Sequence, residues 1–167
     1  MKKILDLGCG KSKKKNAIGF DCIKTDSVDI VGDLNKPLPF ADNEFDYVYL
    51  DNVLEHVNSV ESLLSEVHRI TKPTGYVLIC VPYYNAPTSA DDPTHKHQFS
   101  YKTFDYFTDS FEYHYYFNFS FKIIKKITHR TRIGSLFPEK ITLKLSAYFG
   151  NMITALSVIL QPVKIIK

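Results

Sequence analysis

Two groups of residues in this chain of 167 residues could do chemistry, and the first lies near the start. The apolar run Ile-Leu-Asp-Leu of residues 4–7 is followed at once by Gly8 and Gly10. Glycines directly after a strand let the backbone turn with positive φ and approach a bound cofactor closely. Asp6, one residue inside the end of the run, can offer a carboxylate to the crevice above a sheet. This pattern predicts a small-molecule site at the first strand end.

The second group consists of three histidines. His56 follows a long apolar run, and His95 and His97 lie in the segment Asp-Asp-Pro-Thr-His-Lys-His-Gln-Phe of residues 91–99. Each could bind substrate or act as a general base near neutral pH, or could simply bond backbone in its loop. The spacing of His95, His97 and their acidic neighbours fits no common zinc pattern, so we expect no metal site.

Short apolar runs separated by turn signals must position these residues. We expect strands at about 3–7, 17–20, 28–32, 45–50 and 75–81, and a helix at about 58–71. This order predicts an α/β fold with a doubly wound, mostly parallel sheet. Only residues 11–16 separate Gly10 from the second run, which is too few for a crossover helix. We therefore expect the first helix to be reduced to a turn.

The second half of the chain has a different pattern. Residues 99–121 hold 12 aromatic residues, and alternation at Tyr113, Tyr115, Phe117, Phe119 and Phe121 predicts an aromatic edge strand that continues to about 127. Residues 139–160 carry few charges and predict a C-terminal helix, kinked at Gly150. We expect this amphipathic helix to pack on the sheet and to expose part of its apolar face to a membrane surface or a second subunit.

Composition limits the class of protein. The apolar content of 44% predicts one globular domain over residues 1–167, with a cofactor-binding core at 1–82 and a substrate side at 83–167. Residues 111–167 hold 9 Lys and Arg against 2 Asp and Glu, which favours an anionic partner or a solvated rim. Basic residues do not interleave with the aromatics, so we expect no nucleic acid.

Cysteine usage and the first residues bear on location. Cys9, Cys22 and Cys80 have no metal-ligand spacing and read as small buried side chains in a reducing compartment. Met1 and two lysines lead directly into the first strand rather than into a signal sequence. We expect a cytoplasmic protein, with the C-terminal helix as the means of any peripheral membrane contact.

Two familiar interpretations of the glycine turn fail on geometry. A dinucleotide fingerprint needs a third glycine where Lys13 stands, and a helix that the short connection cannot hold. Gly10, Lys11 and Ser12 match the end of a P-loop, but the required earlier glycine falls at Leu5, inside the strand.

A third interpretation rests on a resemblance. Five segments of the chain resemble, in order, the motifs of small, type 11-like class I S-adenosylmethionine-dependent methyltransferases. They are residues 4–10, the Gly-Phe-Asp that ends in Asp21, the Gly-Asp-Leu that contains Asp33, residues 45–57 and residues 63–76. The resemblance implies S-adenosylmethionine as cofactor, with Asp21 on the ribose hydroxyls and Asp33 and Leu34 beside the adenine. The implied cofactor-binding residues are Asp6, Gly8, Gly10, Asp21, Asp33, Leu34, Asp51 and Asn52.

The resemblance also implies a function. We expect methyl transfer to a small-molecule or cell-surface-glycan-related acceptor, since residues 91–99 also resemble a segment of small methyltransferases linked to surface polysaccharide synthesis. His56, His95 and His97 are the candidate catalytic residues. Ser12 stands where the family has a third small residue, and the first helix is nearly absent. A non-catalytic S-adenosylmethionine-binding protein or a membrane-associated scaffold with the same fold is the alternative.

Overall fold

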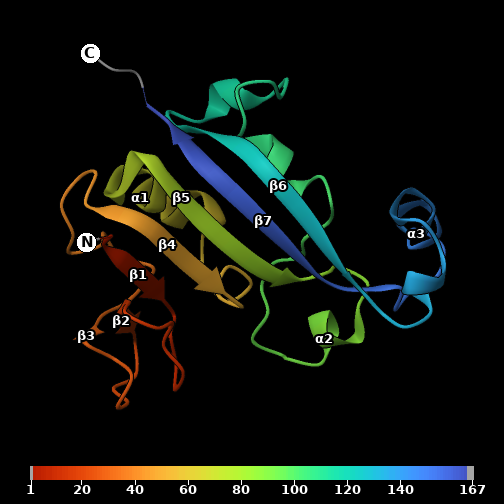
Figure 1. The fold of residues 1–167 in the computed structure, drawn as a ribbon, viewed down its shortest axis with the longest axis horizontal. Helices are drawn as coiled ribbons and strands as arrows, with labels where there is room; N and C mark the ends of the chain where they lie inside the picture. The colour runs from red at the N-terminus through yellow and green to blue at the C-terminus, as the bar shows by residue number, and fades with distance from the viewer. Residues whose placement is uncertain (1, 165–167) are drawn as a thin grey trace.

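The computed structural model describes residues 2–164, within which seven strands form one sheet (Figure 1). The strand order is β3-β2-β1-β4-β5-β7-β6. The strands are β1 (Ile4–Leu7), β2 (Ile18–Asp21), β3 (Ile30–Val31), β4 (Phe45–Asp51), β5 (Thr71–Pro82), β6 (Ser120–Arg130) and β7 (Ile153–Val163). Strands β1 to β5 pair in parallel, whereas β7 is antiparallel to both β5 and β6. The predicted α/β fold with a mostly parallel sheet is confirmed.

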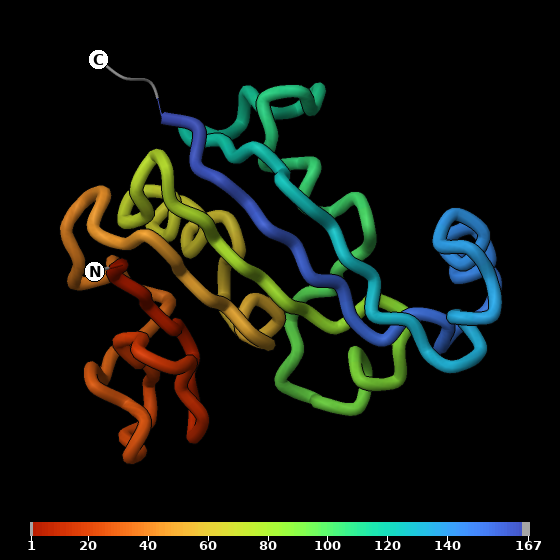
Figure 2. Tube along the Cα trace, viewed as in Figure 1, coloured from red at the N-terminus to blue at the C-terminus, as the bar shows by residue number. Residues whose placement is uncertain are grey.

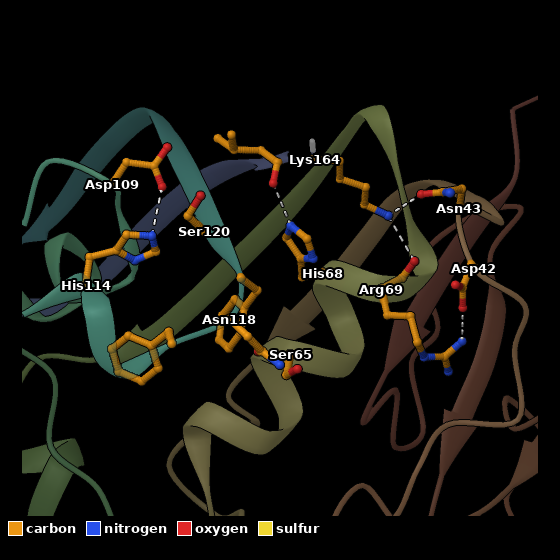
Figure 3. A pocket seen from close by; sticks show the side chains of 13 residues that line it. Asp42, Asn43, Ser65, His68, Arg69, Asp109, His114, Asn118, Ser120 and Lys164 are labelled. Carbon is orange, nitrogen blue, oxygen red and sulfur yellow. Dashed lines mark hydrogen bonds and ion pairs between the residues drawn. The ribbon is translucent and has the colours of Figure 1, made fainter. Parts of the chain in front are cut away.

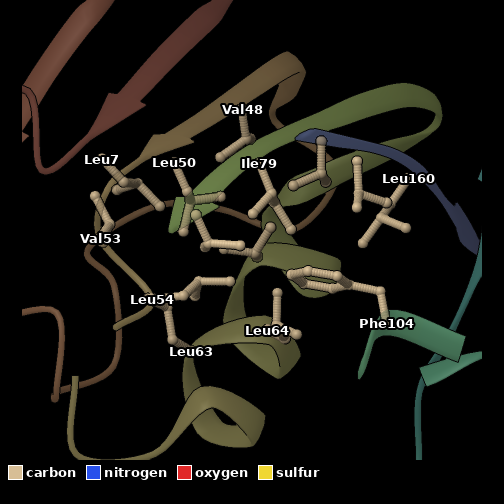
Figure 4. Packing of buried hydrophobic residues seen from close by; sticks show 14 of the residues in the cluster. Leu7, Val48, Leu50, Val53, Leu54, Leu63, Leu64, Ile79, Phe104 and Leu160 are labelled. Atoms are coloured by element: carbon tan, nitrogen blue, oxygen red, sulfur yellow. The ribbon is translucent and has the colours of Figure 1, made fainter. Parts of the chain in front are cut away.

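Helix α1 (Val60–Ile70) covers one face of the sheet. It begins at Ser59, whose side chain accepts a hydrogen bond from the backbone N–H of Ser62. Its buried residues Leu63, Leu64, Val67 and Ile70 recur at helical spacing, as the sequence predicts. Figure 4 shows Leu63 and Leu64 packed beneath Leu50 and Ile79 of the central strands. The hydrophobic core therefore lies between α1 and the sheet.

The other face of the sheet is thinly covered. In the described chain, the connections at residues 8–17, 22–29 and 32–44 contain no helix, so the predicted loss of the first helix is confirmed and extends to the next two crossovers. Figure 1 shows α1 on the far side of the sheet, with the near face open to the viewer. Side chains that point to this face, including Tyr47, Tyr49 and Ile159, are half-buried.

The aromatic segment forms turns rather than the strand predicted from residue 113. It contains the short helices η1 (Thr103–Phe107) and η2 (His114–Tyr116), and β6 begins only at Ser120. Phe104 and Phe107 point into the core from η1, whereas Tyr115 and Tyr116 are exposed. The alternation was therefore misleading, because burial here follows irregular turns that pack on the sheet. β6 is nevertheless the edge strand.

The predicted C-terminal helix at 139–160 is wrong. Only α3 (Glu139–Leu145) is helical there, and β7 follows between β5 and β6, as the tube in Figure 2 shows. Buried Leu156, Val158 and Leu160 alternate along β7, and β-branched residues favour the extended backbone. The contact with a membrane or a second subunit was expected of a long C-terminal helix, and residues 139–160 do not form one.

Three smaller findings complete the fold. The remaining short helices are α2 (Pro87–Ala90) and η3 (Gly134–Leu136). All three cysteines are free, but only Cys9 is buried; Cys22 is exposed because the chain leaves the sheet there, contrary to the prediction. Over residues 2–164, every helix is too short or too polar to cross a membrane.

Candidate active site

A pocket of about 290 Å³ lies where the parallel strands end. Four strand ends contribute to it, since its wall contains residues that follow β1, β2, β3 and β4. The lining residues are Gly8, Asp21, Cys22, Asp33, Leu34, Asn35, Asn52, Val53, His56 and Val57. The structure thus brings together most of the predicted cofactor residues; Asp6, Gly10 and Asp51 lie outside the lining.

The glycine turn after β1 needs its glycines for different reasons. Gly8 has a φ of +70°, and a Cβ there would lie 2.4 Å from Cγ2 of Val53, so it allows close packing as well as the turn. Gly10 has a φ of +54°, but a Cβ there would meet nothing within 4 Å. Its backbone N–H instead donates a 2.9 Å hydrogen bond to Oδ2 of Asp21.

Asp21 is held at the end of β2 by backbone groups. Its Oδ2 accepts from Gly10 and its Oδ1 accepts from the N–H of Ile23 at 3.1 Å. Each carboxylate oxygen retains further lone-pair capacity, so a ribose diol could still donate to it. Asp33 is held in a similar way, because its Oδ1 accepts from the backbone and side-chain N–H of Asn35, and these bonds lower its pKa.

Asp6 and Asp51 hold the short loop that replaces the first helix. Asp6 is 2% exposed and accepts a 2.7 Å hydrogen bond from the backbone N–H of Lys14. Burial raises the pKa of Asp6. The Lys14 side chain reaches Oδ2 of Asp51 at 2.9 Å. These contacts join the loop to the ends of β1 and β4: Asp6 holds the backbone of Lys14, and Asp51 holds its side chain.

Residues 91–98 dock against the turn after β4. The backbone N–H of Lys96 donates to the carbonyl of Glu55 at 2.7 Å, and Nε2 of His97 bonds the carbonyl of Val57 at 2.9 Å. The rings of His56 and His95 lie edge to face, with centroids 4.7 Å apart. The structure therefore joins two of the three predicted histidines. His97 lies apart from them and lines a separate cavity of about 650 Å³.

Glu55 is a candidate functional residue that sequence reasoning missed. It is 1% exposed, burial raises its pKa, and neither carboxylate oxygen has a hydrogen-bond partner within residues 2–164. Its carboxylate lies beside the imidazoles of His56 and His95. The available signal was a charged residue within the apolar stretch Val-Leu-Glu-His-Val of residues 53–57, where burial of an acid calls for an explanation.

A larger hollow of about 710 Å³ lies at the opposite end of the sheet (Figure 3). Several of its polar side chains bond one another or nearby backbone. Nε2 of His68 bonds the carbonyl of Val163 at 3.0 Å, and Nζ of Lys164 reaches the carbonyl of Arg69 at 3.0 Å. Arg69 itself pairs with Asp42 at 2.7 Å. These groups stabilise the end of α1, whereas Nδ1 of His114 in the same wall has no hydrogen-bond partner among the described residues.

The mostly parallel sheet with a pocket at its strand ends is the fold of class I S-adenosylmethionine-dependent methyltransferases. Residues 12–79 match a methyltransferase domain family, which confirms the type 11-like resemblance found in the sequence. A methyltransferase from Archaeoglobus fulgidus shares the fold with a TM-score of 0.67 and 18% identity, over 96% of this chain and 86% of that one. One from Mesorhizobium loti gives a TM-score of 0.63 and 18% identity, over 96% and 90%.

The curated relatives match shorter segments. A demethylmenaquinone methyltransferase from Streptomyces avermitilis is 47% identical over 49 residues, which are 29% of this chain and 21% of the relative. One from Staphylococcus carnosus is 33% identical over 75 residues, which are 45% of this chain and 27% of the relative. The matched part therefore covers less than a third of these relatives. The match of residues 12–79 to a methyltransferase domain family, together with the shared fold, implies S-adenosylmethionine as the cofactor.

Proposed function

We propose that this chain binds S-adenosylmethionine in the strand-end pocket and transfers its methyl group to a small-molecule or glycan-related acceptor. One observation carries the proposal: residues that follow four separate strands line a single pocket, in the order the methyltransferase motifs require. The relatives named demethylmenaquinone methyltransferase support the reaction type. The cyclase SpnF has the same fold with a TM-score of 0.61, so the fold alone does not define the chemistry.

The donor groups of the pocket suit this cofactor. Asp21 offers carboxylate lone pairs to a ribose diol, and Leu34 with Asp33 offers an apolar wall and one acceptor to an adenine. Gly8 lines the pocket without a side chain, so its backbone suits the close approach of a methionine group. No phosphate has to be bound, so the missing N-terminus of a first helix matters less than it would for a dinucleotide.

Catalysis would rest mainly on positioning. The bound cofactor supplies a methyl group already activated on a sulfonium, and the chain has to align an acceptor in line with it. A base is needed only where the acceptor atom bears a proton. His97 is our candidate: its Nε2–H donates to the Val57 carbonyl, which leaves Nδ1 as an acceptor.

The cavity next to His97 is our candidate acceptor site. Its volume is about 650 Å³, and its walls include Phe99, Tyr106 and Phe107. Aromatic walls suit a planar ring or the apolar face of a sugar. Val57, whose carbonyl bonds His97, lines the strand-end pocket, so one hydrogen bond links the walls of the two cavities.

Calorimetric titration tests the proposal directly. S-adenosylmethionine and its demethylated product S-adenosylhomocysteine should both bind at one site per chain, whereas NAD should not. Release of S-adenosylhomocysteine in the presence of quinols or sugar nucleotides then reports turnover and the acceptor class. Absence of binding by either compound would contradict the proposal, and binding without turnover on any acceptor would favour the non-catalytic alternative.

A further inference from the structure

Three acceptor groups converge between the turn after β4 and the loop of residues 91–98. One ligand atom from each of Glu55, His56 and His95 lies within 4.8 Å of the others. The histidines come from segments far apart in the chain, which is why the spacing of His95 and His97 gave no sign of the group. The backbone bond between Lys96 and the Glu55 carbonyl holds the two segments together.

The hydrogen bond of His95 to backbone fixes which of its ring nitrogens carries the proton. Its Nδ1 lies 3.0 Å from the carbonyl oxygen of Ser89, which can only accept. Nδ1 of His95 therefore carries the proton, and a neutral His95 presents a lone pair at Nε2.

His56 is fixed in the same way through a hydroxyl. Nδ1 of His56 lies 2.9 Å from Oγ1 of Thr94, and that hydroxyl donates its single proton to Oδ1 of Asp92 at 2.7 Å. Oγ1 of Thr94 can therefore only accept from His56, so Nδ1 of His56 also carries its proton. The Nε2 atoms of both histidines are left as acceptors.

Glu55 adds a third acceptor that no donor satisfies. It is 1% exposed, and both of its carboxylate oxygens lack a hydrogen-bond partner among the described residues. A buried carboxylate without a partner is costly, and buried charges are normally paired or bound to a metal. With Glu55 ionised and both histidines neutral, the group offers three lone-pair donors within 4.8 Å of one another, a set that suits a cation.

We propose that Glu55, His56 and His95 form a binding site for a divalent transition metal of the Zn²⁺ type. Two imidazoles and one carboxylate form a common ligand set of Zn²⁺ sites that keep an open position. The Nδ1 bonds to Ser89 and Thr94 are the outer-shell contacts that orient such ligands. A tetrahedral site needs ligand atoms roughly 3.4 Å apart, so small side-chain rotations would close it.

The metal site adjoins the candidate cofactor pocket, because His56 belongs to both. A metal with three protein ligands retains a position for an oxygen atom of a water molecule or an acceptor. Oxygen-preferring Mg²⁺ and Ca²⁺ should bind poorly to a set with two nitrogens.

Zn²⁺ titration of the chelator-treated chain tests the proposal. Wild type should bind one Zn²⁺ per chain and gain thermal stability from it, and Co²⁺ should give a visible absorption spectrum. Glu55→Gln and His95→Gln should each weaken Zn²⁺ binding by at least about tenfold. His97→Gln removes a histidine of the same loop whose Nε2 bonds Val57, and should bind Zn²⁺ like wild type.

Circular dichroism without metal checks that each variant folds, and His95→Gln keeps the test decisive if the buried Glu55→Gln does not fold. Three results would overturn the site: no Zn²⁺ binding by wild type, unchanged binding in a folded His95→Gln, or equal weakening in His97→Gln. S-adenosylmethionine titration of the same variants separates this result from a failure of the proposed function.

Discussion

At the scale of single residues, the strand-end pocket depends on backbone placement more than on charge. Asp21 has its carboxylate fixed by two backbone N–H groups before any ligand arrives. Such pre-organisation lowers the entropy that a ligand must lose on binding. Asp6 and Asp51, by contrast, bond Lys14, so these two aspartates stabilise the loop after β1.

Replacing Asp21 should therefore weaken cofactor binding strongly. Asp21→Ala is expected to lose about 2–4 kcal/mol of S-adenosylmethionine binding, because a charged acceptor is removed from a partly enclosed site. Calorimetric titration measures the loss. Asp26→Ala, an equal change of charge at an exposed position of the following loop, is the matched control and should bind normally. Equal affinity in the two variants would contradict the role of Asp21.

Gly8 and Gly10 offer a second residue-scale test. Gly8→Ala should destabilise the fold by roughly 1–3 kcal/mol, because its Cβ would overlap Val53 and its φ is positive. Gly10→Ala should cost less, since its Cβ meets only open space. Urea denaturation gives both values. In a double-mutant cycle, Gly8→Ala should cost less in a Val53→Ala background than in wild type, and an equal cost in both would show that φ alone is responsible.

His97 gives a third test at this scale. His97→Gln should lower turnover while it leaves S-adenosylmethionine affinity unchanged, because His97 lines the acceptor cavity and not the cofactor pocket. A rate profile against pH, compared with wild type, distinguishes loss of a base from loss of packing. Full activity in His97→Gln with a well-chosen acceptor would remove His97 from the mechanism.

At the scale of elements, hydrophobic periodicity predicts the helix and the central strand that pack against each other in the core. The apolar spacing of residues 60–70 and the continuous apolar run of β5 could each be identified, because a single pattern dominates there. The apolar pattern of residues 153–160 is compatible with a helix or a strand. These residues form a strand because they pair with β5 and β6, which are distant in the sequence. The Glu55, His56 and His95 group could not be predicted, because it depends on how the loop of residues 91–98 docks.

The end of α1 should show a pH-dependent stability. Burial lowers the pKa of His68, whose Nε2 bonds the carbonyl of Val163 and whose ring packs on Phe119 and Phe121. The unfolded chain then takes up a proton at His68 before the folded chain does, so stability falls as the pH drops below about 6.5. Lys164 opposes protonation of the same ring.

Denaturation of wild type and His68→Gln between pH 5 and pH 7.5 measures this effect. Gln keeps a donor for the Val163 carbonyl but does not titrate, so the variant should lose less stability on acidification. Parallel curves for the two proteins would show that His68 contributes nothing to the pH dependence.

At the scale of the whole molecule, the sheet has two unequal halves. Strands β5, β6 and β7 contain 12, 11 and 11 residues, whereas β1, β2 and β3 contain 4, 4 and 2. The short strands are followed by loops without helices, and these loops carry half of the residues in the pocket wall. The candidate cofactor site therefore lies on the half with less packing of its own.

This asymmetry predicts where a ligand will act on dynamics. Amide hydrogens of residues 8–35 should exchange faster than those of β5 and β7, because short strands and open loops unfold locally at low cost. Since S-adenosylmethionine would bridge the loops after β1, β2 and β3 to β4, it should slow exchange in residues 8–35 and around His56, and leave β6 and β7 nearly unchanged. Exchange measured by mass spectrometry with and without the compound tests this. Asp21→Ala should abolish the slowing at the same ligand concentration, whereas slowing centred on β6 and β7 would mean that the ligand occupies another site.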